Sequence, residues 1–461
     1  MLPLRKRYPK RGQKKHLRRR INPWQNGLFC FKNNRMLYSH SIAGCVQRTP
    51  KKNGSDNGIK TADLDGVLST LENFKETFEK ESLYRPFTIT EETADLVNIN
   101  DIASRINKNF THLVVLGTGG STLTGQALVA LRPAYYEQKV EIIFHDNVDP
   151  VTTQSLLNYI PLETTCVLVI SKSGTTLETL SQFALFYDTL HRKLGDRATQ
   201  NFLVITDPKD NPLRRIAASL DLKTLDHDPE VGGRFSIFSN VGLIPAAVAG
   251  LDVRAIRKGA HMVLADFLSN RESAPAVGAA LNLCLIEKGV NTTVFMPYAD
   301  RLNGLAQWVR QIWAESLGKK GKGSNPVTAM GTIDQHSQLQ LYLDGPKDKL
   351  ISLITLNQSG GKPVNTAVFK EKSVLYMNGK TMADIMTAEQ EATLHSLENQ
   401  GCLVRHFALD TLDEATLGAL AMHFMLETVA TAHLLKLNAF DQPAVEEGKT
   451  LARKALESVK A

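Results

Sequence analysis

The chain has 461 residues, of which 43% are hydrophobic and 22% are charged. These proportions are typical of a soluble globular protein and exclude an intrinsically disordered chain, and the length predicts two or three domains. The formal net charge is +7, but residues 1–55 contain 15 Lys and Arg and no Asp or Glu, which leaves 39 basic and 47 acidic residues in the remainder. This acidic body argues against an enzyme that binds nucleic acid, because duplex affinity depends on Lys and Arg.

The cysteines and the apolar runs of the sequence indicate the cellular compartment of the protein. No Cys-x-x-Cys pair and no ligand spacing of a zinc site is present, so we expect reduced, structural thiols and no bound metal. No apolar run reaches the roughly 18 residues that a membrane span requires. We therefore predict a soluble, cytoplasmic protein that does not contact a membrane. The five cysteines are Cys30, Cys45, Cys166, Cys284 and Cys402.

The first 55 residues form a basic extension. Ten Lys and Arg lie in residues 5–20, and such a block of like charges repels itself, so we predict that residues 1–55 are disordered. No apolar segment of a secretory signal follows, and the low Ser content and the prolines disfavour a transit peptide. A polybasic arm for RNA or anionic lipid stays open, as does an upstream segment translated before a true start at Met36.

Residues 56–230 predict a first α/β domain. A helix begins near Ala62, and then short β-rich runs alternate with segments of helix length, which is the pattern of a parallel sheet with crossover helices. The predicted strands of this domain are residues 111–116, 140–144, 166–170 and 202–206.

Residues 231–461 predict a second domain of the same kind. The fold class is therefore α/β, with two doubly wound domains whose parallel sheets are flanked by helices. The predicted strands are residues 292–296, 350–356 and 402–408, and the predicted helices are residues 256–267, 276–288, 302–317 and 382–399, with a long apolar helix over 414–436 and a last helix from 443.

Two turns rich in glycine and hydroxyl groups each follow a predicted strand and precede a helix. Residues 116–121 are Leu-Gly-Thr-Gly-Gly-Ser, and residues 171–176 are Ser-Lys-Ser-Gly-Thr-Thr. A helix N-terminus has unpaired N–H groups and a partial positive charge, so small residues at that position form a seat for a phosphate group. We therefore expect a phosphorylated small molecule as the ligand.

Other interpretations of these turns stay open. The first turn has the Gly-x-Gly spacing of a dinucleotide site, and Asp146 lies about where such a site has the acidic residue that binds the ribose. Against this interpretation, Thr122 stands at the position of the third glycine. A plain strand-to-helix turn is the simpler alternative. The second turn lacks the P-loop spacing, and a capping box of Thr175 and Glu178 is compatible with a phosphate seat.

A polar stripe on a predicted helix is a candidate for proton transfer, and an arginine in a glycine-rich turn is a candidate for charge stabilisation. Gln307, Gln311 and Glu315 recur at i, i+4 and i+8 of a predicted helix and form one polar stripe. The stripe is either solvated or, where apolar residues enclose it, holds a carboxylate poised for proton transfer. Arg234 follows two glycines that allow close approach to a ligand, and a structural ion pair is the alternative.

His336 and Lys449 are weaker candidates by themselves. The imidazole of His336 titrates near neutral pH and suits a proton shuttle, although a single loop histidine is more often structural. Lys449 lies about two turns into a helix that Asp441 and Pro443 open, where lysines usually only face solvent.

Several separated segments resemble one known family. Residues 171–179 resemble the phosphate-binding signature of sugar isomerase domains. Residues 231–236 (Val-Gly-Gly-Arg-Phe-Ser) and 440–449 (Phe-Asp-Gln-Pro-Ala-Val-Glu-Glu-Gly-Lys) resemble the two signatures of the glucose-6-phosphate isomerase family. The matches follow the family's order. Ala444 replaces a family glycine and Asn240 a smaller residue, and neither change removes a functional group.

The resemblance implies two sugar-isomerase-type domains and an activity without metal or organic cofactor. That activity is the interconversion of glucose 6-phosphate and fructose 6-phosphate through an enediolate, in glycolysis and gluconeogenesis. It implies Glu315 as the base, Arg234 as the group facing the enediolate, and His336 and Lys449 in ring opening. The implied substrate-binding residues are Gly120, Ser121, Ser171, Lys172, Ser173, Thr175, Thr176, Gln311 and Gln442.

The resemblance also implies a homodimer in which the neighbouring subunit supplies His336 to each active site. Two other functions stay open. One is an isomerase of this fold that acts on mannose 6-phosphate or on another sugar phosphate. The other is a non-catalytic sugar-phosphate sensor, which would need only the phosphate seat, and the presence together of Glu315, His336, Arg234 and Lys449 counts against it.

Overall fold

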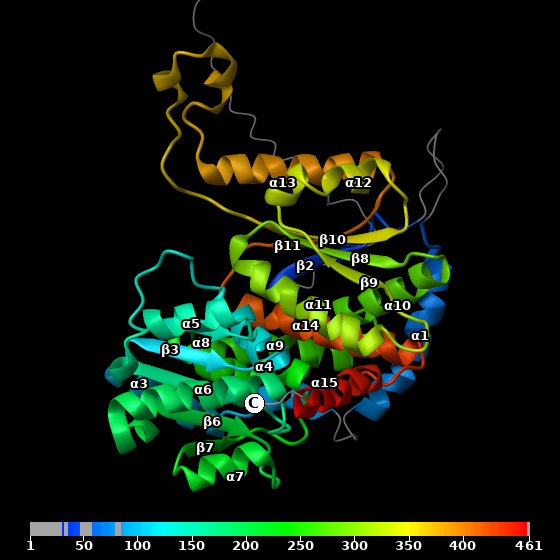
Figure 1. The fold of residues 1–461 in the computed structure, drawn as a ribbon. Coiled ribbons are helices and arrows are strands. Elements are labelled where there is room, and N and C mark those ends of the chain that lie inside the picture. Colours follow the sequence, from blue (N-terminus) through cyan, green and yellow to red (C-terminus); the bar gives the residue numbers. More distant parts are fainter. Residues whose placement is uncertain (1–29, 32–35, 47–57, 79–83, 459–461) are drawn as a thin grey trace, which may run out of the picture.

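The structure is a computed structural model that describes residues 30–31, 36–46, 58–78 and 84–458. Two sheets are each flanked by helices, and α9, α11 and α14 lie between them (Figure 1). The α-helices are α1 Thr61–Phe78, α2 Arg85–Thr88, α3 Ala94–Asn109, α4 Gly120–Val129, α5 Pro150–Tyr159, α6 Leu177–Leu194, α7 Pro212–Ser219, α8 Asn240–Val248, α9 Val253–Ser269, α10 Ala274–Glu287, α11 Asn303–Leu317, α12 Leu339–Asp344, α13 Met382–Asn399, α14 Glu414–Leu434 and α15 Glu446–Ser458.

The first sheet is parallel and has the strand order β4-β3-β5-β6-β7. All six residues of β5 are buried, because helices cover both faces of a doubly wound sheet. Neighbouring β3 and β5 mark the point where the strand order reverses, and ligands of such folds bind at the carboxyl ends of the strands there. The strands are β3 His112–Leu116, β4 Glu141–His145, β5 Thr165–Ile170, β6 Phe202–Thr206 and β7 Lys223–Asp226.

The second sheet has the order β1-β2-β11-β10-β8-β9. Its parallel part, β9-β8-β10-β11, repeats the order β4-β3-β5-β6 of the first sheet, so the two halves share a topology that no sequence repeat reveals. This confirms the predicted pair of doubly wound units. The strands are β1 Cys30–Phe31, β2 Tyr38–Ser41, β8 Thr292–Pro297, β9 Asn325–Thr328, β10 Lys349–Leu356 and β11 Leu403–Leu409.

The prediction that all of residues 1–55 are disordered is wrong for residues 36–46. Strand β2 pairs antiparallel with β11, and the side chains of Tyr38 and Ile42 are buried. The basic block that motivated the prediction ends at Arg20, whereas residues 36–46 contain no Lys or Arg and several apolar side chains. Residues 1–29 lie outside the described residues. Helix α1 packs against α10 and α14, so this N-terminal part lies with the second sheet, and the domain boundary at residue 230 stays a prediction.

Helix α14 is the centre of the core. Among the described residues it is the one helix long and apolar enough to span a membrane, and 94% of its apolar window is buried inside the fold, as in a core helix. Its Glu427 accepts hydrogen bonds from Arg405 (2.6 Å) and Asn282 (2.6 Å). Burial alone would raise the pKa of Glu427, but Arg405 and His423 outweigh it and hold that pKa below its usual value.

Two glycines let α9 and α14 cross in backbone contact. A Cβ atom on Gly418 would lie 2.0 Å from the carbonyl oxygen of Ile256, and one on Gly259 would lie 1.8 Å from that of Ala415. Real Cβ atoms do not approach backbone this closely, so any side chain would separate the two helices.

We expect Gly418→Ala to lower the free energy of unfolding by about 1–3 kcal/mol or more, because α9 and α14 would have to move apart. Gly66→Ala is the matched control: no atom lies within 4 Å of its Cβ position in α1, so there alanine should stabilise by about 0.5–1 kcal/mol. The midpoint of urea unfolding measures both. Equal midpoints for the two variants would contradict the packing described.

Candidate active site

The two glycine- and hydroxyl-rich turns lie side by side at the carboxyl edge of the first sheet. One connects β3 to α4 and the other connects β5 to α6, and Leu116 pairs with Val169 at the ends of the two strands. Neither α4 nor α6 has a side-chain cap at its N-terminus, whereas α5, α7, α9 and α14 are each capped by an Asp or Asn. The first N–H groups of α4 and α6 are therefore not taken up by a capping side chain.

The second turn presents its hydroxyl groups as a set. The predicted capping box of Thr175 and Glu178 is absent, because Thr176 is the N-cap of α6 and its hydroxyl lies 2.9 Å from Ser171 Oγ. Thr175 Oγ1 donates to Ser173 Oγ (3.0 Å). Gly174 has a φ of +64°, and a Cβ atom there would lie 1.9 Å from Asn211 Oδ1, so this turn requires glycine both for its backbone and for its packing.

Lys172 ties this turn to the loop that carries Arg234. Its Nζ donates to the carbonyl oxygens of Pro229 (2.8 Å) and Val231 (2.9 Å). Burial lowers the pKa of Lys172, although Asp207 and Asp228 act in the opposite direction. The ammonium group therefore holds two segments together while it adds positive charge next to the hydroxyl groups.

Arg234 is buried, at 6% exposure, and each of its nitrogens is used. Nε donates to Ser316 Oγ (3.0 Å), and Nη1 donates to Glu315 Oε2 (3.0 Å) and Gln442 Oε1 (2.8 Å). Nη2 donates to the carbonyl oxygens of Ala439 and Asp441. Burial lowers the pKa of the Arg234 guanidinium, and Glu315 opposes that shift, so a charge that is costly to bury is compensated by a carboxylate and by hydrogen bonds.

The loop of Arg234 also contacts the first turn. A Cβ atom on Gly120 would lie 2.2 Å from the carbonyl oxygen of Gly233 and 2.5 Å from the backbone nitrogen of Arg234. Trp308 of α11 donates its indole N–H to the carbonyl oxygen of Arg234 (2.8 Å). The first turn, the Arg234 loop and α11 are thus packed together, and Gly120 is required for that approach.

The polar stripe of α11 lines a pocket that opens to solvent. Glu315 Oε1 accepts from Gln311 Nε2 (2.9 Å), and the carboxylate, at 34% exposure, is half-buried. The Oε1 atom of Gln311 is buried and has no hydrogen-bond partner among the described residues. The pocket has a volume of about 440 Å³ and is lined by Gly119, Leu123, Gln307, Arg310, Gln311, Ala314, Glu315, Asn325 and Pro326.

The structure brings most of the predicted site residues together, but it leaves two outside. His336 is exposed in the 3-10 turn η7 (Ile333–His336), and in the described part of the chain its side chain has no hydrogen-bond or ion-pair partner. Lys449 in α15 is 65% exposed and pairs with Glu446 (2.6 Å). Neither side chain contacts Arg234 or Glu315, so their predicted roles stay predictions.

Sequence reasoning missed the residues that support Arg234 and the phosphate seat. Ser316 and Trp308 bind Arg234 from α11, and Asn211 packs against Gly174. The spacing of Trp308 and Ser316 marked them only as parts of the helix, and Asn211 before Pro212 indicates a helix start but not its contact with a distant turn. No local signal identifies these partners, since each contact joins segments far apart in the chain.

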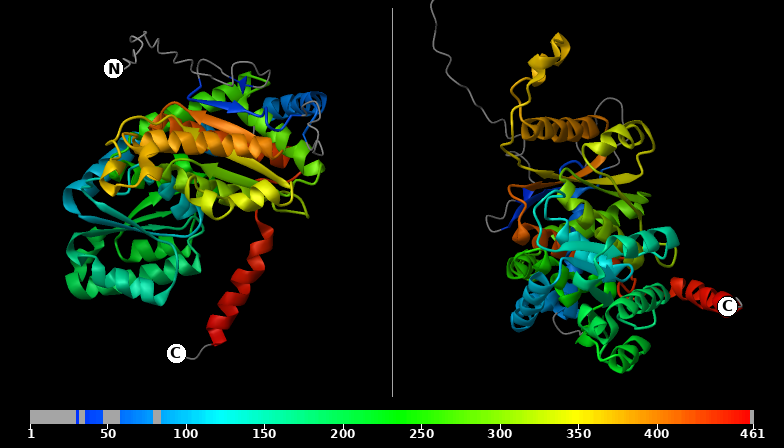
Figure 2. Two further views of the ribbon diagram at one scale, coloured as in Figure 1. Left: turned by 90° about the horizontal axis from the view of Figure 1, so that it is seen from above. Right: turned by 60° about the vertical axis from the view of Figure 1, so that its left-hand side comes forward.

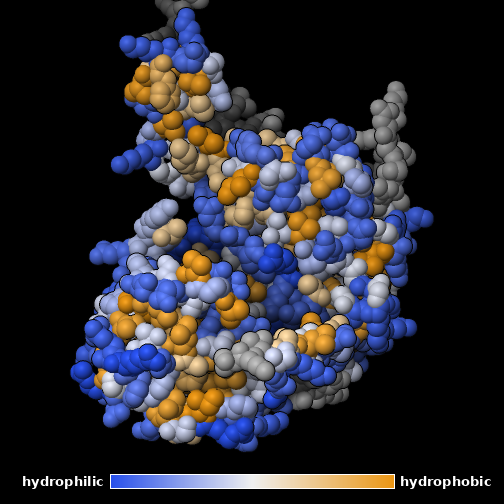
Figure 3. Space-filling view, viewed as in Figure 1, coloured by the Kyte–Doolittle hydropathy of each residue, from blue (hydrophilic) through white to orange (hydrophobic). Residues whose placement is uncertain are grey.

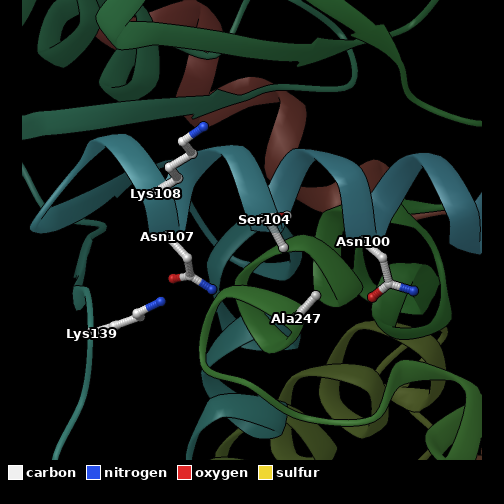
Figure 4. Close-up of a pocket in the computed structure, with 7 residues that line it drawn as sticks. Asn100, Ser104, Asn107, Lys108, Lys139 and Ala247 are labelled. Atoms are coloured by element: carbon white, nitrogen blue, oxygen red, sulfur yellow. The ribbon is translucent and has the colours of Figure 1, made fainter.

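A larger hollow of about 570 Å³ lies elsewhere, between α3 and α8 (Figure 4). Asn100, Ser104 and Asn107 project from α3, and Lys139 points toward the Asn107 amide from another segment. Its lining contains no carboxylate and none of the glycine-rich turns. The smaller pocket at Glu315 is therefore the candidate active site.

The chain is similar to known proteins of one family. The family model for phosphoglucose isomerase matches residues 92–461. The chain is 40% identical over 362 residues to the glucose-6-phosphate isomerase of Rubrobacter xylanophilus, covering 76% of this chain and 84% of that protein. It is 36% identical over 414 residues to that of Carboxydothermus hydrogenoformans, covering 84% and 89%.

Solved structures show the same fold. A hypothetical protein from Thermus thermophilus superposes with a TM-score of 0.79 at 34% identity, covering 86% of this chain and 98% of that one. A glucose-6-phosphate isomerase from Chlamydia trachomatis superposes with a TM-score of 0.73 at 21% identity, covering 91% and 88%. Fold and site thus define a phosphosugar-isomerase-type α/β protein. Within that class, the chain belongs to the phosphoglucose isomerase family.

We expect Gly174→Ala to weaken the binding of inorganic phosphate at least tenfold, because the added Cβ would displace Asn211 and open the turn. Gly195→Ala is the matched control, since Gly195 has a similar φ of +60° but no atom within 4 Å of its Cβ position. Isothermal titration of both variants with phosphate measures the difference. Equal affinities would show that the turn is not the phosphate seat.

Proposed function

We propose that the protein is an aldose–ketose isomerase that interconverts glucose 6-phosphate and fructose 6-phosphate. The observation that carries the proposal is the half-buried Glu315 carboxylate, held by Arg234, in a pocket next to a seat for phosphate. The relatives named above as glucose-6-phosphate isomerases support this activity. We infer that the enzyme acts in the cytoplasm, in glycolysis and gluconeogenesis.

The phosphate group of the substrate would anchor it. We assign phosphate binding to the backbone and hydroxyl groups of the turns at residues 120–121 and 171–176, including Ser171, Ser173, Thr175 and Thr176, with Lys172 adding positive charge. The free Oε1 atom of Gln311 would then accept from a sugar hydroxyl group. Binding at the phosphate end fixes the distance of the reacting carbons from α11.

Glu315 would carry the proton between C1 and C2. It removes a proton from the carbon next to the carbonyl group, and the resulting enediolate has negative charge on oxygen. Arg234 lies against Glu315 and would stabilise that charge, because a guanidinium fixed by five hydrogen bonds needs no rearrangement as the charge forms. Return of the proton to the other carbon, together with transfer of the remaining hydroxyl proton from one enediolate oxygen to the other, gives the product.

Ring opening would need a further acid–base group beyond Glu315, because hexose phosphates in water are mainly closed rings. We assign this step to His336 and Lys449, with His336 supplied by a second copy of the chain in a homodimer. The support is the exposed position of His336, away from its own Arg234 and Glu315, together with the family resemblance. Gln442 accepts a hydrogen bond from Arg234 and lies shortly before the start of α15. We expect it to position the ring-opening groups there.

We expect Glu315→Gln to lower kcat by about 10²- to 10⁴-fold or more while substrate still binds, because the amide cannot take up a proton but keeps the shape of the side chain. A coupled assay for glucose 6-phosphate formation measures kcat, and titration with fructose 6-phosphate measures binding. Glu163→Gln, on a surface carboxylate paired with Lys193, is the control and should leave both unchanged. Near-normal turnover in Glu315→Gln would assign the base elsewhere.

Mixing two inactive variants tests the shared active site. Glu315→Gln and His336→Ala chains that reassociate at random should recover about a quarter of the wild-type activity, because half of the dimers are mixed and each mixed dimer has one intact site. Mixing Glu315→Gln with Arg234→Lys is the control: both residues lie in one subunit, so no activity should return. Absence of recovery with His336→Ala would show that His336 acts within its own chain or has no role.

A further inference from the structure

The turn η7, which carries His336, has a bonded backbone although the imidazole itself is exposed. The Asp334 N–H donates to the carbonyl oxygen of Met330 (2.7 Å), and the Met330 N–H donates back to Asp334 Oδ2 (2.6 Å). Asp334 Oδ1 also accepts from the Ser337 hydroxyl group. These bonds close the turn before and after His336, so the position of the imidazole depends on what holds η7 against the rest of the fold.

Gln335, the neighbour of His336 in η7, is held by two residues from different elements. Its Oε1 atom accepts from the Tyr298 hydroxyl group (2.8 Å), and its Nε2 atom donates to Glu389 Oε2 (2.7 Å). Turning the amide by 180° would bring the oxygen atoms of Gln335 and Glu389 against each other, so this pairing allows one orientation of the Gln335 side chain. Tyr298, Gln335 and Glu389 form the η7 brace, which joins this turn to the end of β8 and to α13.

Tyr298 anchors the η7 brace to the second sheet. It is fully buried, and its backbone N–H donates to the carbonyl oxygen of Ile354 in the neighbouring β10 (2.8 Å). A Cβ atom on Gly331 would lie 2.5 Å from the Tyr298 ring, so the segment before η7 packs directly against this ring. Burial raises the pKa of Tyr298 to about 12, so the hydroxyl group keeps its proton at neutral pH and can donate to Gln335.

Glu389 anchors the η7 brace to α13. This helix packs on β10 and β11 through buried residues that include Leu394 and Leu397, and it covers the face of the second sheet away from α11 and α14 (Figure 1, Figure 2). The turns η8 (Thr366–Phe369) and η9 (Lys372–Met377), which precede α13, form an arm that projects from the body and has an orange apolar patch (Figure 3). The packed face of α13, and not this arm, therefore sets the position of Glu389.

The ring and the hydroxyl group of Tyr298 have separate tasks. The ring belongs to a buried apolar cluster with Tyr342 and Leu394, and a phenylalanine ring would fill the same space. The hydroxyl group adds a hydrogen bond to the side chain next to His336. Because a displacement of about 1 Å at a reacting group can cost about a hundredfold in rate, the hydroxyl group is placed to affect the use of His336 more than the packing of the core.

We propose that Tyr298 and Glu389 are positioning residues for ring opening, because they hold Gln335 and through it the turn that presents His336. This inference rests on the proposed function, in which His336 is a ring-opening group. Neither Tyr298 nor Glu389 contacts the substrate in this role. The η7 brace restricts the turn, so His336 reaches the sugar ring in one geometry.

Tyr298→Phe removes only the hydroxyl group and should lower kcat by about ten- to a hundredfold, with KM for fructose 6-phosphate changed less than about twofold. KM should hold because the phosphate seat and Glu315 lie in other segments. Tyr38→Phe is the matched control: Tyr38 is also buried, and its hydroxyl group lies 2.7 Å from His423 Nδ1, away from η7. It should leave kcat unchanged. A wild-type kcat in Tyr298→Phe would overturn the proposal.

A double-mutant cycle separates positioning from a general structural role. If Tyr298 acts through His336, then Tyr298→Phe has no further effect on kcat in a chain that already carries His336→Ala. The loss in Tyr298→Phe should also not exceed that in His336→Ala. A loss by the same factor in both backgrounds would show that Tyr298 only supports the fold, and would overturn the proposal.

Variants of Glu389 test the other end of the η7 brace. Glu389→Ala removes the acceptor and should lower kcat about tenfold, whereas Glu389→Gln keeps an oxygen atom that can accept from Gln335 and should restore most of the activity. Glu391→Ala, on an exposed carboxylate of the same helix, is the matched control and should leave kcat unchanged. A wild-type kcat in Glu389→Ala would overturn the role of Glu389.

Hydrogen exchange provides a readout that does not depend on activity. The amides of Asp334 and Gln335 donate to carbonyl oxygens of Met330 and Thr332, and they should exchange about tenfold faster or more in Tyr298→Phe. Equal exchange rates in Tyr298→Phe, Tyr38→Phe and wild type would overturn the proposal.

The same set of proteins separates this inference from the proposed function. A wild-type protein without isomerase activity would refute the proposed function, and the exchange rates would still decide whether the η7 brace holds the turn. A wild-type kcat in His336→Ala would refute the assignment of ring opening to His336 and, with it, this inference. An impaired His336→Ala beside a fully active Tyr298→Phe would refute the inference alone.

Discussion

The ion pair of Arg234 and Glu315 is the interaction on which the site depends. Arg234 brings together α11, the loop at residues 439–442 and, through its backbone, the first glycine-rich turn. A buried guanidinium is costly unless each donor has an acceptor, so these segments can only take positions that satisfy it. Because Lys172 ties the loop that carries Arg234 to the second turn, the phosphate seat and the carboxylate are positioned by one connected set of contacts.

Much of the fold follows from patterns that the sequence displays. The buried strands β3, β5 and β6 contain continuous apolar runs, α11 has the spacing of an amphipathic helix, and α14 is a long apolar segment. The sequence did not predict β1, which has two residues, or β2, β7 and β9, which have four residues each and are rich in polar residues, so pairing with a neighbouring strand determines them. The second sheet repeats the strand order of the first, and this repetition is likewise visible only in the structure.

In the candidate site, too, features set by neighbouring residues could be predicted from the sequence, whereas contacts between distant segments could not. The two turns are local sequence motifs, and Gln311 and Glu315 are spaced four residues apart, as on one face of a helix. The turns and the stripe could therefore be predicted from the sequence. Arg234 contacts Ser316 and Ala439, and Gly174 contacts Asn211. These contacts join distant segments, so the spacing of residues along the sequence does not predict them. His336 and Lys449 stand outside the site of the single chain, so their roles in ring opening stay predictions.

The central claim is that one sugar phosphate bridges the turn at residues 171–176 and the carboxylate of Glu315. A crystal structure of the protein with bound fructose 6-phosphate tests it most directly. The account predicts the phosphate group within hydrogen-bond distance of the Ser173 and Thr175 hydroxyl groups, with C1 and C2 next to Glu315. A phosphate bound away from both glycine-rich turns, or reacting carbons out of reach of Glu315, would contradict it.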